Sequence, residues 1–146
     1  DLAGPMAFAI LMGSSRAFYG IFGDKINLER FMQYSAILCM ISYLMIAFIP
    51  VPALGILGCA VCGLSVGIMW PGTFSMAAAS VKRGGTALFA RLALAGDVGC
   101  SSGPTYVGMI SGVLNDNLKL GIFAALVFPV LMIIGIKMIG RLRKYD

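Results

Sequence analysis

Long apolar stretches, separated by short polar or proline-rich turns, run along the whole chain. A helix rises about 1.5 Å per residue, so about 20 apolar residues cross the roughly 30 Å hydrocarbon core of a bilayer. A soluble protein keeps such stretches shorter and gives each helix a polar face. The pattern therefore predicts an all-α integral membrane protein with five transmembrane helices, over about residues 2–22, 31–49, 53–81, 86–114 and 120–139.

The breaks between these stretches carry residues that favour turns. Pro50-Val51-Pro52 ends the second helix, and Asn115-Asp116-Asn117 ends the fourth. Two further prolines, Pro71 and Pro104, lie inside the third and fourth helices. A proline removes a backbone donor and clashes with the preceding turn, so a kink is predicted at each of them.

Composition and charge exclude several classes of protein. With 60% hydrophobic and 12% charged residues, the chain has too few polar side chains for a soluble fold, in which about 25% are charged. The net charge of +5 comes from short clusters between apolar stretches, so nucleic acid is not an expected partner. The chain has no histidine, and each cysteine lies in an apolar run, so no metal site and no cofactor are expected. The pair Cys59 and Cys62 is interpreted as helix packing rather than redox chemistry.

The basic residues predict the orientation in the membrane, because loops rich in Lys and Arg stay in the cytoplasm. Five helices place the two termini on opposite sides, and only Lys119 lies on the side of Asp1. We therefore expect a multi-pass protein of the cell (inner) membrane with a cytoplasmic C-terminus. The basic residues on that side are Lys25, Arg30, Lys82, Arg83, Arg141, Arg143 and Lys144.

Side-chain size predicts which helices face lipid. Residues 31–49 and 120–139 are bulky throughout, which suits contact with acyl chains. The other three helices hold small-xxx-small pairs that let backbones approach closely, so we expect them to form the protein-facing interior. These pairs are Gly63 and Gly67, Gly99 and Gly103, and Gly108 and Gly112.

Arg16, Arg91 and Asp97 are charged residues within the first and fourth predicted helices. A charge at membrane depth costs at least about 2.5 kcal/mol, so each needs a partner, water or a function. Asp97 is predicted near the midplane, and Ser101 shares its helical face. Arg91 is six residues away, which points it elsewhere, so Arg16 is the best available partner. Asp97 either forms a fixed interhelical contact, or contacts a substrate or takes up a proton, because desolvation disfavours a charged carboxylate.

Residues 16–30 resemble the GxxxD(R/K)xGR(R/K) signature of the major facilitator superfamily, which occupies a cytoplasmic loop and helps to form the inner gate. Gly20, Asp24 and Lys25 match the signature, whereas Asn27-Leu28-Glu29 departs from it. Residues 69–75 (Met-Trp-Pro-Gly-Thr-Phe-Ser) resemble the proline-kinked tenth helix of sugar-type members such as the fucose permease, and residues 95–104 resemble their eleventh helix. The resemblance implies part of the six-helix C-terminal bundle of that fold, from helix eight to helix twelve.

By that resemblance, the intact protein would move a small solute by alternating access, as a secondary active transporter with proton coupling as one expectation. The solute would be a sugar or an organic anion, and Trp70 would stack on a sugar ring or serve only in packing. The chain begins at Asp1 without a methionine, so it is expected to be a fragment whose partner is the missing N-terminal half. Such a fragment is not expected to transport alone.

Two other classes of function are weighed. A non-transporting membrane subunit or anchor would use its helices only to pack against partners. An intramembrane enzyme is not expected, because neither histidine, nor paired membrane aspartates, nor an activated nucleophile is evident.

The predicted orientation can be tested with inserted tags. A tag at the C-terminus should be labelled only after the cells are permeabilised, whereas a tag in the Pro50-Val51-Pro52 turn should be labelled in intact cells. Labelling of the C-terminal tag from the external face of intact cells would overturn the orientation.

Overall fold

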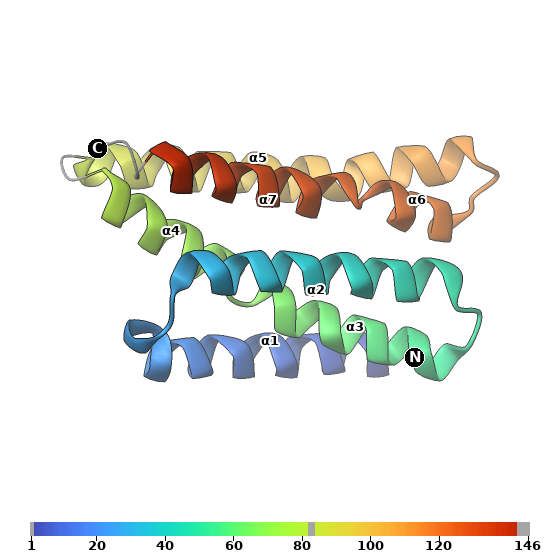
Figure 1. Cartoon of the computed structure of the whole chain (residues 1–146). Coiled ribbons are helices and arrows are strands. Elements are labelled where there is room, and N and C mark those ends of the chain that lie inside the picture. Colours follow the sequence, from blue (N-terminus) through green and yellow to red (C-terminus); the bar gives the residue numbers. More distant parts are fainter. Residues whose placement is uncertain (1, 82–83, 143–146) are drawn as a thin grey trace.

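A computed structural model describes residues 2–81 and 84–142, and these residues form helices joined by short turns (Figure 1). Each predicted span is helical, but the third and fifth are divided. The elements are α1 (Ala3–Phe22), the short 3₁₀ helix η1 (Gly23–Lys25), α2 (Leu28–Phe48), α3 (Pro52–Val66), α4 (Met69–Ser80), α5 (Gly85–Val113), α6 (Leu118–Ala124) and α7 (Val127–Leu142).

Successive spans run back and forth between two ends of the molecule (Figure 1). Within the described residues, four stretches are long and apolar enough to cross a membrane: Ala3–Lys25, Leu28–Phe48, Pro52–Ser80 and Leu118–Arg141. Helix α5 is also long enough, at 29 residues, but its glycine, serine and threonine residues make it less apolar. Helix α1 begins at one end and α7 finishes at the other, as the predicted threading requires. Which end faces the cytoplasm stays a prediction.

The predicted turns lie where the sequence placed them. Pro52 is the first residue of α3, where its missing N–H is not needed. Asn115 and Asp116 both have φ of 57°, a left-handed conformation that these two residue types tolerate. Asn27 caps α2, since its side chain accepts a hydrogen bond from the Arg30 backbone N–H. The predicted basic residues Lys82, Arg83, Arg143 and Lys144 lie outside the described residues.

Two of the five spans break four residues before a proline. The third span is interrupted at Gly67 and Ile68, ahead of Pro71, where the sequence predicted a kink. The fifth is interrupted in the same register, at Ala125 and Leu126, ahead of Pro129. This second break was not predicted. Both follow from the N–H that proline lacks, because that group would have bonded to the carbonyl four residues earlier. By contrast, α5 continues through Pro104 as one helix, so no break accompanies the second predicted kink.

Helix α2 lies at the centre of the bundle, packed against α3, α4, α6 and α7. The prediction that residues 31–49 would lie outermost is therefore wrong. The buried residues of α2 are mainly small and form one stripe: Met32, Ser35, Ala36, Cys39, Ser42 and Ala47. Its bulky Ile37, Ile41 and Leu44 do face outward, so side-chain size predicted the outer face of α2 but not its place in the bundle. Helices α1 and α5, predicted to lie in the interior, each bury one residue, Ser15 and Ser111 respectively.

A small apolar core joins α2, α4 and α7. Met32, Met76 and Ile136, one from each helix, are buried together. Gly72 of α4 lies against the Met32 side chain, so a larger residue there would displace it. This core holds α4, the second half of the third span, against α7, the second half of the fifth span.

The glycine pairs divide into two groups. Gly63 and Gly67 lie where α1 crosses α3: an added Cβ at Gly63 would overlap the Phe8 carbonyl, and one at Gly67 would lie 2.7 Å from the Met12 carbonyl oxygen. This pair packs as predicted. The pairs on α5, Gly99 with Gly103 and Gly108 with Gly112, have open space at each Cβ position. They are not packing sites for the described helices.

This difference gives a matched test of α1–α3 packing. The Gly63→Ala variant should lose about 1–3 kcal/mol of unfolding free energy, because the methyl group must displace the α1 backbone. The same change at Gly99 should stay within about 0.5 kcal/mol, since its Cβ would meet no neighbour. Unfolding in mixed detergent micelles measures both values. If Gly63→Ala lost no more unfolding free energy than Gly99→Ala, α1 would not approach α3 closely at Gly63.

Candidate functional site

Arg16 of α1 satisfies the carbonyl group that the third-span proline leaves free. Its Nε–H donates a hydrogen bond to the Gly67 carbonyl oxygen at 3.3 Å. Gly67 is four residues before Pro71, so its carbonyl is the one that a residue 71 N–H would have bonded. A broken helix at membrane depth is tolerated where a neighbouring helix supplies the missing partner. The arginine therefore has a specific local role that the sequence did not reveal.

A second bond fastens α1 to the other side of the same break. The Tyr19 hydroxyl lies 3.3 Å from the Ser75 hydroxyl of α4, within hydrogen-bonding distance. The three residues of the predicted gate motif follow directly: Gly20 lies exposed on the last turns of α1, and Asp24 and Lys25 lie exposed in η1. The motif therefore lies at one end of the bundle (Figure 1).

Trp70 joins α4 to α5. Its indole ring lies on the backbone of Gly96, where an added Cβ would collide with the ring. The Phe74 ring lies 4.8 Å from Trp70, and Phe89 of α5 stacks on Phe74 at 5.7 Å, both between centroids. Trp70 remains 45% exposed. One part of the ring is therefore a packing element, and the other is free to contact a ligand.

One face of α5 is polar and open. Asp97, Ser101, Ser102, Thr105 and Tyr106 line a surface hollow of about 590 Å³. The Ser101 hydroxyl donates to the Asp97 backbone carbonyl at 2.9 Å, and Thr105 donates to that of Ser101 at 2.8 Å. The hydroxyls thus have local acceptors, but the Asp97 carboxylate is exposed, and no partner for it is found in the described part of the chain.

The structure brings together only some of the residues singled out from the sequence. Asp97 and Ser101 share the polar face of α5, and Trp70 touches the residue before Asp97. Arg16 does not meet Asp97, because it bonds to Gly67, and because α1 packs on α3 while α5 packs on α6. The predicted pairing is therefore wrong for this chain. Arg91 is exposed on α5.

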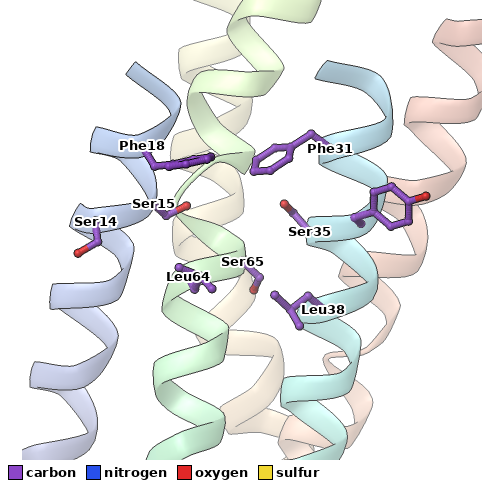
Figure 2. Close-up of a pocket in the computed structure, with 9 residues that line it drawn as sticks. Ser14, Ser15, Phe18, Phe31, Ser35, Leu38, Leu64 and Ser65 are labelled. Atoms are coloured by element: carbon purple, nitrogen blue, oxygen red, sulfur yellow. The ribbon is translucent and has the colours of Figure 1, made fainter. Parts of the chain in front are cut away.

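A cavity that the sequence did not predict lies between α1, α2 and α3. It measures about 600 Å³, and its lining includes four serines together with Phe18, Phe31 and Tyr34. Figure 2 shows the Ser15 and Ser35 hydroxyl groups directed toward each other across this space. Isolated serines in three apolar stretches were the available signal, but only the packing of the helices brings them together.

Metal-ligating groups do not cluster in residues 2–81 and 84–142: no set of three or more His, Cys, Asp or Glu side chains is placed to hold a metal ion. The four cysteines, Cys39, Cys59, Cys62 and Cys100, are free thiols. Comparison of the chain with protein-family models, curated proteins and solved structures finds no match. The resemblance to the major facilitator superfamily therefore rests on the motifs quoted above.

The role of Arg16 predicts a specific coupling with Pro71. Replacing Arg16 with Leu should cost about 1–3 kcal/mol through the unpaired Gly67 carbonyl. In a Pro71→Ala background the cost should be smaller, because the new N–H can bond that carbonyl. A double-mutant cycle on unfolding free energy in micelles measures the difference. The Arg91→Leu change serves as the control and should show no coupling. An equal cost of Arg16→Leu in both backgrounds would refute the role.

Proposed function

We propose that the chain is part of a secondary transporter that moves a small polar solute across a membrane by alternating access. The observation that carries this proposal is the Asp97 carboxylate, exposed beside hydroxyl groups near the middle of the 29-residue α5. In this proposal the polar face of α5 lines the solute passage. Asp97 contacts the solute or takes up the coupling proton.

The energetics favour a passage or a protein partner over lipid at this face. A carboxylate at the bilayer centre costs at least about 2.5 kcal/mol, and such residues normally face a bundle interior or a water-filled cavity. Serine and threonine hydroxyls beside it supply donors and acceptors of the kind that fix a polar ligand. Trp70 of α4 packs on Gly96, the residue before Asp97, and its half-exposed ring offers an aromatic surface for a sugar ring.

The broken third span also supports the proposal. Transporters often bind solutes where helices are discontinuous near the midplane, because unwound backbone groups are available there. Here the break at Gly67 and Ile68 lies between the 15-residue α3 and the 12-residue α4, and Arg16 is bound to it. The family resemblance adds that the chain would be helices eight to twelve, which work together with an N-terminal half. A sugar or an organic anion is the proposed class of solute.

A second candidate is a non-transporting membrane subunit, and one observation favours it. Gly108 and Gly112 share the face of Asp97 by helical spacing, and both have open space at the Cβ position. A small-residue surface of this kind lets another helix approach α5 closely. In that case Asp97 would be satisfied by a fixed polar partner rather than by a solute.

One substitution separates the two candidates. Asp97→Asn keeps the side-chain size but removes the charge and the exchangeable proton. In the full-length gene product that contains these residues, it should abolish solute accumulation without lowering membrane expression or assembly. Uptake of labelled sugars and organic anions into cells gives the first readout, and quantitative blotting of membranes gives the second.

The Gly108→Leu variant provides the converse comparison. If α5 mainly packs on another helix, the Gly108→Leu variant should disrupt assembly. In that case the Asp97→Asn variant should weaken assembly too. Full accumulation by the Asp97→Asn variant would remove this residue from the transport mechanism, and with it the observation on which the proposal rests.

A further inference from the structure

The cavity between α1, α2 and α3, called here the serine cavity, has a polar interior and an apolar mouth (Figure 2). Ser15, Ser35 and Ser65 are its buried members. Phe18, Tyr34 and Leu64 are exposed at 49%, 70% and 40%, so they form the rim. The cavity lies on different helices from the polar face of α5. A site here is therefore separate from the proposed solute passage.

Two of its hydroxyl groups are available to a ligand. Ser14 donates to the Ile10 carbonyl and Ser65 to the Cys62 carbonyl, so both have local acceptors. Ser15 and Ser35 are each only 7% exposed, and no hydrogen-bond partner for either hydroxyl is found among the described residues. Every fully enclosed side-chain N or O atom in the described residues has a hydrogen-bond partner. Since the Ser15 and Ser35 hydroxyls have none, neither of them is fully enclosed. Both hydroxyls are therefore reached from the cavity.

The lining also defines the charge and polarity of the occupant. The nine lining residues are serines, aromatic residues and leucines, without a charged side chain among them. A carboxylate or an ammonium group would lose its hydration there without gaining a counter-ion. A fully apolar occupant would leave Ser15 and Ser35 without partners. The chemistry that fits both is an uncharged hydroxyl or carbonyl group attached to an apolar body.

We propose that the serine cavity binds a neutral, membrane-dissolved molecule that enters with its hydroxyl or carbonyl end first. Ser15 of α1 and Ser35 of α2 hold this polar end from opposite sides, while Phe18, Tyr34 and Leu64 contact the apolar body at the mouth. The source is the bilayer, because the apolar rim belongs to helices long and apolar enough to cross one. A volume of about 600 Å³ falls in the usual range of small-molecule sites.

Photolabelling of the purified protein in phosphatidylcholine nanodiscs tests this inference. The probe is a hexadecanol that carries a diazirine near the hydroxyl end, and its control is the hexadecane with the diazirine at the same carbon. Adducts are mapped by mass spectrometry. The alcohol should label Phe31, Tyr34 and Leu38 roughly three- to tenfold more than the alkane, which corresponds to one hydrogen bond. Both probes should label Leu131 and Ile134, exposed residues of α7, equally.

Variants identify the groups that hold the polar end. The double variant Ser15→Ala, Ser35→Ala should reduce the alcohol-to-alkane ratio in the cavity to about one. The control is Ser42→Ala, which removes another buried serine of α2. The Ser42 hydroxyl already donates to the Leu38 carbonyl, so this variant should leave the alcohol-to-alkane ratio unchanged. The comparison of the two probes in the unaltered protein needs no variant, and it decides the question even if the double variant fails to fold.

Three results would overturn the inference. Equal labelling of the cavity by alcohol and alkane would show that lipid chains or water occupy it without selection. Equal labelling by hexadecanoate at pH 8 would show that neutrality is not required. Stronger labelling by a diazirine-bearing butanol added from the aqueous phase would assign the cavity to a water-borne solute rather than to the bilayer. Because none of these readouts involves transport, they are independent of the fate of the Asp97→Asn variant.

Discussion

The absence of water in a bilayer core requires every backbone N–H and C=O group there to find its partner inside the protein. Continuous helices meet this requirement by themselves, but three spans contain a proline that removes a donor: Pro71, Pro104 and Pro129. At Pro71 the freed Gly67 carbonyl accepts a bond from Arg16. Arg16 is itself a charged group in an apolar span. The arginine and the free Gly67 carbonyl therefore each supply the partner that the other needs. The bond fixes α1 beside the break and thereby positions Tyr19 against α4.

Close helix contact depends on small residues, and their distribution explains the arrangement of the bundle. Gly63 and Gly67 let α1 lie directly on α3, and the small stripe of α2 lets that helix pack at the centre. Helix α5 contacts its neighbours differently: Trp70 fits against Gly96, and Gly121 of α6 comes close to the Val107 carbonyl. These contacts occupy one side of α5. The face that carries Asp97, Ser101 and Thr105 is left open.

Local rules predicted much of the fold. The number of spans, the turns at Pro50–Pro52 and Asn115–Asn117, and the break before Pro71 all follow from residue types near each other in sequence. The break before Pro129 obeys the same rule, and Pro129 inside an apolar stretch was the signal that could have predicted it. The central place of α2 could not be predicted from average side-chain size, because only one face of a helix decides what it packs against. The stripe from Ser35 to Ser42 was the available signal.

The candidate sites were predicted less well than the helices. Spacing correctly grouped Asp97 with Ser101, since both lie on one helix. The partner of Arg16 and the meeting of Ser15 with Ser35 depend on how separate helices are placed, and one sequence does not contain that information in a local form. The Gly67 carbonyl is free to accept a hydrogen bond only because residue 71 is a proline. It meets its donor, Arg16, only because α1 crosses α3 there.

The two proline breaks also have a mechanical consequence. Helices α3 and α6 start from the same end of the bundle, but α3 has 15 residues and α6 has seven, so the breaks lie about 23 Å and about 10 Å from that end. Bending at either break ruptures few helical hydrogen bonds, because the ladder is already interrupted there. The compliant points of the molecule therefore lie at different depths. The segments beyond the breaks, α4 and α7, are joined through the core of Met32, Met76 and Ile136. Because the two breaks lie at different depths, α4 and α7 do not share one hinge plane. Tilting one of these helices therefore makes the other slide along its own axis.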